Sequence, residues 1–144
     1  MRIYQNHERC IGCCACEIHC KTENDVPVGA RLSKIVPVGP IITGSVPRMS
    51  FIFTTCFHCK EPWCVEVCPS GAMQKRQADG IVYVDAEACV GCMACIDACP
   101  WAIPQCNDDT GKVIKCDYCR DRTGSGLKPA CVTGCTTGAL HWGE

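Results

Sequence analysis

The chain has 144 residues, of which 47% are apolar when cysteine is included, and its 14 basic and 15 acidic residues give a formal charge of −1. This charge argues against a strong nucleic-acid footprint, and prolines interrupt the most apolar stretch, so no run of about 18 apolar residues could span a membrane. Eighteen residues are cysteine and only three are leucine, too little for an ordinary hydrophobic core, so we expect bound metal to hold the fold together.

The first predicted element is a cysteine loop, CIGCCACEIHC, at residues 10–20. Four of its five cysteines keep the spacing C-x2-C-x2-C-x3-C and form group one: Cys10, Cys13, Cys16 and Cys20. In ferredoxins this spacing lets three thiolates hold one iron–sulfur cluster while the fourth reaches a neighbouring cluster. Cys14 does not fit the spacing, and we expect it to be a small packed thiol. The alternative is that it competes with Cys13 as a ligand. His19 is expected on the surface of a helix.

Two other interpretations of so many cysteines compete with iron–sulfur clusters. A disulfide scaffold needs an oxidising compartment, but residues 1–10 show neither an apolar signal region nor a twin-arginine pair. The neighbours Cys13 and Cys14 also suit separate bridges poorly. Zinc sites favour two C-x2-C pairs that close one tetrahedral site. The spacing and its repetition therefore favour iron–sulfur clusters, and a zinc protein remains the alternative from the structural class.

Strands and a second cysteine group are predicted next. Residues 30–38 and 49–56 read as a strand pair joined by a loop rich in proline and glycine. Group two follows and consists of Cys56, Cys59, Cys64 and Cys68. The pair Asp79-Gly80 then lies between two strand-like runs, which indicates a hairpin within residues 73–85.

The rest of the chain repeats this plan. Group three consists of Cys89, Cys92, Cys95 and Cys99, and group four of Cys116, Cys119, Cys131 and Cys135. Between them, residues 107–116 are predicted to form a hairpin around Gly111. All four groups keep three residues before their last cysteine, so they are internal repeats.

Each last cysteine is predicted to lie on a short helical stretch. The third and fourth cysteines are four residues apart, which on a helix places both on one face about 6 Å apart along the axis, so that they can reach two different clusters. Pro69 and Pro100 directly follow Cys68 and Cys99, where a helix start or a turn needs no amide donor. The sequence therefore predicts an α+β fold of short helices and β-hairpins built around four iron–sulfur clusters.

The gaps between the groups predict how they pair. Between Cys68 and Cys89 there is room for one turn and one hairpin, as in a compact two-cluster ferredoxin, so we pair group two with group three. Groups one and four then pair across the chain. We predict one polyferredoxin domain, 1–144, with two nested ferredoxin-like modules: module two (56–104) lies inside module one (1–55 plus 105–144).

This pairing predicts sixteen thiolate ligands for four [4Fe-4S] clusters, because the last cysteine of each group reaches the cluster of the paired group. The predicted sets are Cys10, Cys13, Cys16 and Cys135 for cluster 1; Cys116, Cys119, Cys131 and Cys20 for cluster 2; Cys56, Cys59, Cys64 and Cys99 for cluster 3; and Cys89, Cys92, Cys95 and Cys68 for cluster 4. The same sixteen cysteines are the predicted iron ligands, and no catalytic residue is predicted.

Two longer motifs resemble those of one protein family. The pattern C-x-H-C-x-x-P-x-C-x-x-x-C-P-x-G-A is matched by residues 56–72, and K-C-D-x-C with a later P-A-C-V-x-x-C by residues 115–135. Over nearly its whole length the chain resembles the four-cluster iron–sulfur subunits of molybdenum- and tungsten-pterin oxidoreductases, the group that contains those of dimethyl sulfoxide reductase and formate dehydrogenase. The resemblance implies the same pairing of the groups. It also implies that groups one and four face the catalytic partner and groups two and three the electron acceptor.

The resemblance implies a non-catalytic electron-transfer subunit, with a pterin-dependent molybdenum or tungsten catalytic subunit and a further electron-accepting subunit or carrier as partners. In length the chain is similar to the small subunits of soluble tungsten aldehyde oxidoreductases. It shows no phosphate loop or dinucleotide motif. We expect a cytoplasmic protein with no nucleic-acid partner and no direct membrane insertion. A subunit of a hydrogenase complex and a free-standing polyferredoxin remain the alternatives.

Residues beside the ligands are expected to have structural roles. We expect His58 to form a hydrogen bond rather than to replace a cysteine ligand, and Cys106 to be packed like Cys14. The run Lys75-Arg76 is predicted to be a solvated hairpin face. Three aromatic residues are expected to exclude water from clusters: Trp63, Trp101 and Tyr118.

Overall fold

The computed structural model describes the backbone of residues 1–144 and the side chains of all of them except Thr43. The helices are α1 (Ala15–Glu23), α2 (Trp63–Glu66), α3 (Ala94–Asp97), α4 (Arg120–Gly124) and α5 (Ala130–Thr133), with a 3-10 helix at His7–Arg9. The strands are β1 (Arg2–Gln5), β2 (Ser33–Thr43), β3 (Val46–Thr55), β4 (Met73–Lys75), β5 (Val82–Val84), β6 (Gln105–Asn107), β7 (Lys112–Ile114) and β8 (Leu140–Gly143). They form two-stranded antiparallel sheets, which confirms the predicted α+β plan of short helices and hairpins.

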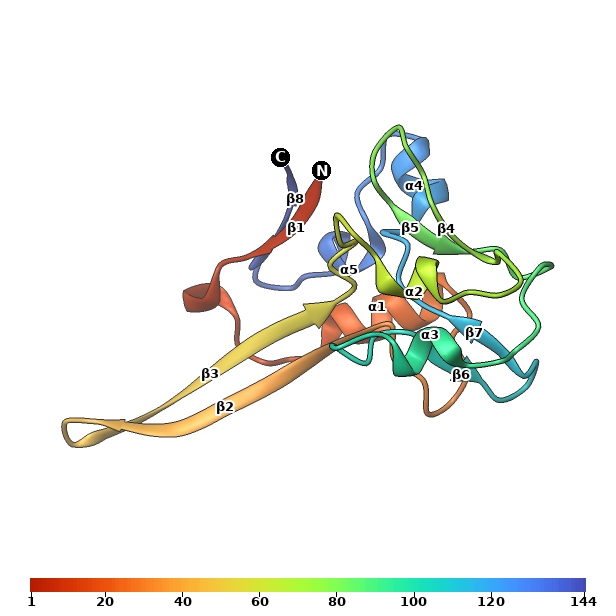
Figure 1. Ribbon diagram of the computed structural model, residues 1–144. Coiled ribbons are helices and arrows are strands. Elements are labelled where there is room, and N and C mark those ends of the chain that lie inside the picture. Colours follow the sequence, from red (N-terminus) through yellow and green to blue (C-terminus); the bar gives the residue numbers. More distant parts are fainter.

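The two ends of the chain are joined by a sheet that the sequence analysis does not predict. β1 pairs with β8 from Arg2 opposite Gly143 to Gln5 opposite Leu140, and Figure 1 shows the two termini side by side. This sheet brings the segment that leads into group one against the segment that follows group four.

β2 and β3 form a long arm that extends away from the rest of the molecule (Figure 1). The predicted strand pair is confirmed, but the predicted long loop is wrong, because β2 runs to Thr43 and β3 begins at Val46. Pro37, Pro40 and Pro47 therefore lie within the strands. Both strands of a two-stranded ribbon are edge strands, where a residue without an N–H group can be accommodated.

The two predicted short hairpins are confirmed as β4–β5 and β6–β7. In the first, the Arg76 N–H donates to the Ile81 carbonyl at 2.8 Å, and the Asp79 carboxylate accepts from the Ile81 N–H at 3.1 Å. Asp79 also forms an ion pair with Arg76. The turn is thus fixed by the Asp-Gly pair that identified it.

The third cysteine of each group lies in a helix, whereas the fourth does so only in group one. Cys20 lies in α1, but Cys68, Cys99 and Cys135 each follow their helix by two residues. The prediction that every last cysteine lies on a helix is therefore wrong for three groups, because α2, α3 and α5 are only four residues long. The prolines after Cys68 and Cys99 lie in turns, as predicted.

α1 packs against α5, and a glycine permits the close approach. A Cβ atom at Gly134 would lie 2.0 Å from the His19 Cδ2 atom, which is nearer than real Cβ contacts come. His19 is otherwise exposed, as predicted for a helix surface. The contact joins groups one and four.

Cysteine forms a large part of the buried interior. The larger core contains thirteen buried residues, and five of them are cysteine: Cys16, Cys20, Cys56, Cys116 and Cys131. The smaller core consists of Met73, Val82, Cys95 and Val113. Within the described residues, none of the helices is long and apolar enough to cross a membrane. Six of the seventeen residues in the two cores are thus predicted ligands.

Candidate iron–sulfur sites

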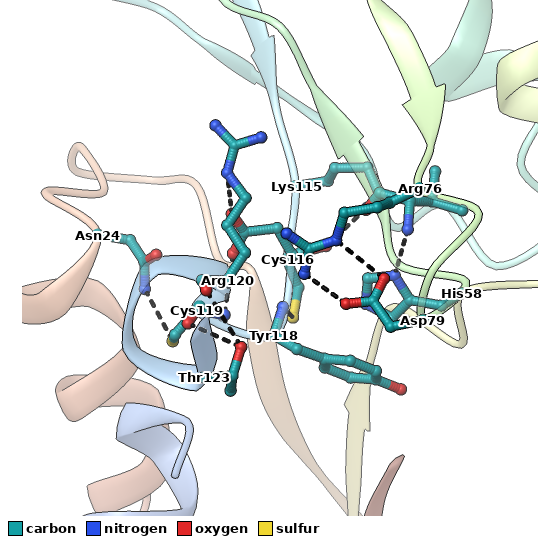
Figure 2. A network of polar contacts seen from close by, with 12 residues as sticks. Asn24, His58, Arg76, Asp79, Lys115, Cys116, Tyr118, Cys119, Arg120 and Thr123 are labelled. Atoms are coloured by element: carbon teal, nitrogen blue, oxygen red, sulfur yellow. Dashed lines mark hydrogen bonds and ion pairs between the residues drawn. The ribbon is translucent and has the colours of Figure 1, made fainter. Parts of the chain in front are cut away.

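Three cysteines of group four and one of group one line a single cavity: Cys116, Cys119, Cys131 and Cys20. The Asn24 side-chain nitrogen lies 3.9 Å from the Cys20 Sγ and 3.8 Å from the Cys119 Sγ, and Figure 2 shows it pointing at Cys119. Burial raises the pKa of the Cys116 thiol to about 12 and that of Cys20 to about 11. The four thiols of predicted cluster 2 thus share one largely buried site.

The same arrangement occurs between groups two and three. Another cavity is lined by four cysteines, three from group three and one from group two: Cys89, Cys92, Cys95 and Cys68. Burial raises the pKa of the Cys95 thiol to about 11, and the thiols of Cys64 and Cys68 add to the rise. The Val113 N–H lies 3.5 Å from the Cys89 Sγ, so a strand of the β6–β7 hairpin borders this site. These are the four thiols of predicted cluster 4.

The other two predicted sets are brought together less completely. Cys59, Cys64 and Cys99 line one cavity beside Trp63. Burial raises the pKa of the Cys64 thiol to about 11, and the nearby thiols of Cys56, Cys99 and Cys59 contribute to the rise despite the opposing charge of Lys115. All four thiols of predicted cluster 3 therefore lie near one another.

In the set for predicted cluster 1, burial raises the pKa of the Cys16 thiol to about 12, and the thiols of Cys135 and Cys10 are among the groups that add to it. The Cys13 Sγ lies 3.9 Å from the hydroxyl of Thr136, the residue directly after Cys135. Thiols from the two ends of the chain are thus close together next to the α1–α5 contact.

The last cysteines of groups two and four receive hydrogen bonds from the backbone. The Cys68 Sγ accepts from the Met73 N–H at 3.3 Å, and the Cys135 Sγ accepts from the Ala139 N–H at 3.1 Å. Although partial burial acts to raise both pKa values, backbone N–H groups lower them below that of an ordinary thiol, first the N–H of Met73 at Cys68 and those of Leu140 and Ala139 at Cys135. Hydrogen bonds of this kind favour the thiolate, which is the form that binds iron.

The chemistry of these sites fits an iron–sulfur cluster. Buried thiols with raised pKa values stay protonated at neutral pH unless bound metal takes the place of the protons. In the described part of the chain, no three His, Cys, Asp or Glu side chains are placed to hold a single metal ion. In a [4Fe-4S] cluster the four thiolates bind four different irons, so they surround a larger body than one ion.

Groups two and four meet through two matching turns. In C-F-H-C and C-D-Y-C, the residue before the second cysteine has a positive φ, 46° at His58 and 58° at Tyr118. The N–H of each donates at 3.4 Å to the first cysteine of its own group, Cys56 or Cys116. The His58 and Tyr118 rings are in contact, with centroids 3.8 Å apart. The predicted sites of clusters 2 and 3 are thus neighbours.

The predicted hydrogen-bonding role of His58 is confirmed. Its Nδ1 accepts from the Val82 N–H at 2.9 Å (Figure 2). Burial, and then the nearby Lys115 cation, lower the pKa of the ring to about 2. His58 is therefore neutral at physiological pH, and its one N–H is on Nε2.

Other expectations for residues beside the ligands need correction. Cys14 is exposed rather than packed, because it takes up a left-handed φ of 58° directly before α1. Cys106 is only half-buried, in β6. Trp63 and Trp101 are each 57% exposed, whereas Tyr118 is buried. Trp63 still lines the cavity that contains Cys59, Cys64 and Cys99, so its side chain covers part of that site.

Lysines also contribute more than the sequence predicts. Lys75 is half-buried, and its Nζ donates to the Cys59 carbonyl at 3.1 Å and to the Lys60 carbonyl at 2.5 Å, so it holds the loop of group two instead of facing solvent alone. Lys115 is buried next to Cys116. The motif K-C-D-x-C includes this lysine, but the spacing of the motif does not predict that the Lys115 side chain is buried.

Comparison with known proteins identifies the family. The 4Fe-4S dicluster domain family matches residues 47–144. The chain is 41% identical over 141 residues to the thiosulfate reductase electron transfer subunit PhsB of Salmonella typhi, a match that covers 96% of this chain and 73% of that protein. It is 40% identical over 142 residues to the B subunit of the anaerobic dimethyl sulfoxide reductase of Escherichia coli, covering 94% of this chain and 69% of that protein.

A third relative is the iron-sulfur subunit of the nitrate-inducible formate dehydrogenase of Escherichia coli, which is 37% identical over 149 residues, covering 93% of this chain and 51% of that protein. These matches agree with the resemblance expected from the two long motifs, and they cover 93–96% of this chain. With its repeated cysteine groups, its short hairpins and its shared thiol cavities, the chain is a [4Fe-4S] protein and belongs to the 4Fe-4S dicluster domain family.

Proposed function

We propose that this chain is the electron-transfer subunit of a molybdenum- or tungsten-pterin oxidoreductase and that it carries four [4Fe-4S] clusters. Relatives of the chain are named as an electron transfer subunit of thiosulfate reductase and an iron-sulfur subunit of formate dehydrogenase. The observation that best supports the proposal is that Cys20 shares a cavity with three thiols of group four, about a hundred residues away in sequence.

The ligands in this proposal are the sixteen cysteines in the four predicted sets. Exchange of the last cysteine between paired groups is supported by the two cavities that each contain a complete set. Each bound cluster takes up and releases single electrons. The chain itself positions the clusters, supplies backbone N–H groups to thiols such as Cys68 and Cys135, and buries at least one cysteine of each set.

The contacts between groups support one order of clusters along the electron-transfer pathway, from cluster 1 through clusters 2 and 3 to cluster 4. Clusters 1 and 2 are linked by Cys16 and Cys20 in α1, and clusters 2 and 3 by the contact of Tyr118 with His58. Clusters 3 and 4 are linked by the nearby thiols of Cys64 and Cys95. Cluster 1 would then face the catalytic subunit and cluster 4 the acceptor, as the family resemblance implies for the two halves of the chain. Exposure does not decide this order, because Cys59 of cluster 3 is exposed as well as Cys13 and Cys92.

The substitution Cys135→Ala tests the exchange of ligands. The variant should lose about a quarter of the iron and sulfide of the anaerobically purified protein, because one of four clusters lacks a thiolate. Electron paramagnetic resonance should show that the missing signal is the one that is also lost in Cys10→Ala, since both residues belong to proposed cluster 1.

The matched control is Cys14→Ala, which removes an exposed thiol from the same loop and should leave all iron in place. If Cys135→Ala instead removes the signal that depends on Cys116, the last cysteine belongs to its own group and the nested arrangement is wrong. Stoichiometric zinc with little iron in the unaltered protein would contradict the whole proposal.

A further inference from the structure

Lys115 is a buried cation at the boundary between groups two and four (Figure 2). The residue is only 7% exposed. Its Nζ donates to the carbonyls of Val82 and Cys116, the latter at 2.6 Å. Among the described residues, no carboxylate forms an ion pair with it. A buried charge without a partner of opposite charge is unfavourable, so another negative group is expected to compensate it.

The position of Lys115 is fixed from both sides of the boundary. Val82, in the hairpin that follows group two, gives its carbonyl to Lys115 and its N–H to the His58 ring of group two. Lys115 itself directly precedes Cys116 of group four. Val82 therefore links the lysine to the turn of group two, and the Cys116 carbonyl links it to group four. These two hydrogen bonds leave the ammonium little freedom to move toward solvent.

This ammonium lies beside both groups. Its Nζ donates to the carbonyl of Cys116, the first cysteine of group four, and to the carbonyl of Val82, whose N–H is bonded to His58 of group two. The other ionic groups nearby are Asp79, which faces His58 and pairs with Arg76, and Asp117, which pairs with Arg120. Both carboxylates thus already have a cationic partner, whereas the charge of Lys115 is available to anionic groups in the interior.

We propose that Lys115 is the counter-charge shared by clusters 2 and 3 and that it raises their reduction potentials relative to clusters 1 and 4. The inference rests on the proposed function for the positions of these clusters. A cluster becomes more negative when it takes up an electron, and a fixed buried cation stabilises that added charge. Clusters 2 and 3, in the middle of the electron-transfer pathway, would therefore be reduced more readily than they would without the lysine.

The test compares two neutral variants in the protein with its clusters loaded. Lys115→Met keeps the length of the side chain without its charge, and Lys115→Gln keeps a hydrogen-bond donor without the charge. A redox titration followed by electron paramagnetic resonance should show that reduction of two clusters becomes less favourable. A unit charge about 10 Å away at an effective dielectric of about 20 changes an equilibrium constant roughly tenfold, and tenfold corresponds to about 59 mV for one electron.

Lys128→Met is the matched control, since Lys128 is an exposed lysine that lies two residues before α5 of group four. Screening by water and salt should leave the four potentials of this variant nearly unchanged. If the Met and Gln variants each load four clusters and keep the original potentials, or shift all four equally, the inference is wrong.

Two further results separate the inference from the proposed function. If neither neutral variant loads four clusters, the titration is made on Lys115→Arg, which keeps the charge: unchanged potentials support the inference, and a fall of two potentials despite the charge overturns it. Iron analysis of the unaltered protein is independent of Lys115. Fewer than four clusters there would reject the proposed function itself.

Discussion

Thiols in the four cysteine groups differ mainly in the polar groups that contact them. Cys68 and Cys135 accept backbone hydrogen bonds, whereas Cys20 and Cys119 share the side-chain amide of Asn24. Hydrogen bonds to cluster sulfurs are among the factors that set the potential of a cluster. Sites with identical cysteine ligands are therefore expected to have different potentials, because their neighbours differ.

Gly134 offers a test of the contact that joins groups one and four. Gly134→Ala places a methyl group against the His19 ring, and overpacking of this kind costs about 1–3 kcal/mol. The variant should melt several degrees below the unaltered protein in a calorimetric scan. Adding His19→Ala should restore the melting temperature, because it removes the atoms that clash.

Gly124→Ala is the control for this substitution. Gly124 lies in α4, and a Cβ atom there meets no neighbour within 4 Å. Alanine has the higher helix propensity, so this variant should be as stable as the unaltered protein or more stable. A Gly134→Ala protein with an unchanged melting temperature would show that His19 simply rotates away.

At the scale of elements, the sequence was informative where the signal is local. The Asp79-Gly80 pair identified the β4–β5 hairpin, because a turn of this kind is determined by adjacent residues. Cysteine spacing and the pairing of the groups likewise picked out four thiols that line one cavity in two of the four predicted sets. In contrast, no local signal joins β1 to β8, and the prolines of the arm suggested a loop because edge strands tolerate residues that central strands exclude.

Parts of the candidate site were also beyond sequence reasoning. The burial of Lys115 and the position of Asn24 between two thiols depend on how distant segments pack. The exposure of Cys14 follows from a left-handed backbone conformation that a non-glycine residue seldom adopts. Spacing alone therefore identifies candidate ligands, while the groups that tune them require the fold.

The arm provides a prediction for a whole element. Its outer part carries exposed apolar residues such as Ile41, Ile42 and Val46, and none of residues 38–42 and 44–50 belongs to the two cores. At its base, by contrast, the Gln5 side chain donates a hydrogen bond to the Phe51 carbonyl and accepts one from the Phe53 N–H. Replacing residues 38–50 by a short turn should therefore leave the iron content unchanged.

Iron analysis and circular dichroism check this outcome, and the shortened protein should also aggregate less, because an exposed apolar ribbon is removed. Gln5→Ala serves as the comparison, since it removes the two hydrogen bonds at the base of the arm and leaves the outer part of the arm intact. Loss of iron from the shortened protein would show that the outer arm takes part in holding a cluster.

At the scale of the molecule, the fold depends on what its cysteines bind. Five of the thirteen residues in the larger core are cysteine. Without metal, these thiols should stabilise the fold much less than they do as metal ligands, because the free energy of metal binding is lost. Removal of iron by a chelator, without denaturant, should abolish the cooperative thermal transition and the near-ultraviolet circular dichroism signal. Treatment with the same chelator saturated with iron is the control. A metal-free protein that still melts cooperatively would mean that the apolar core is sufficient.

The pairing of β1 with β8 also has a consequence for how the protein is made. More than 130 residues separate Gln5 from its partner Leu140, and at about 5–20 residues per second a ribosome needs roughly 7–27 s to synthesise them. During that interval the segment between them can begin to fold, whereas the first strand has no partner. The thiols that leave the ribosome first are therefore enclosed last, and they are the ones that the cell must protect from oxidation for longest.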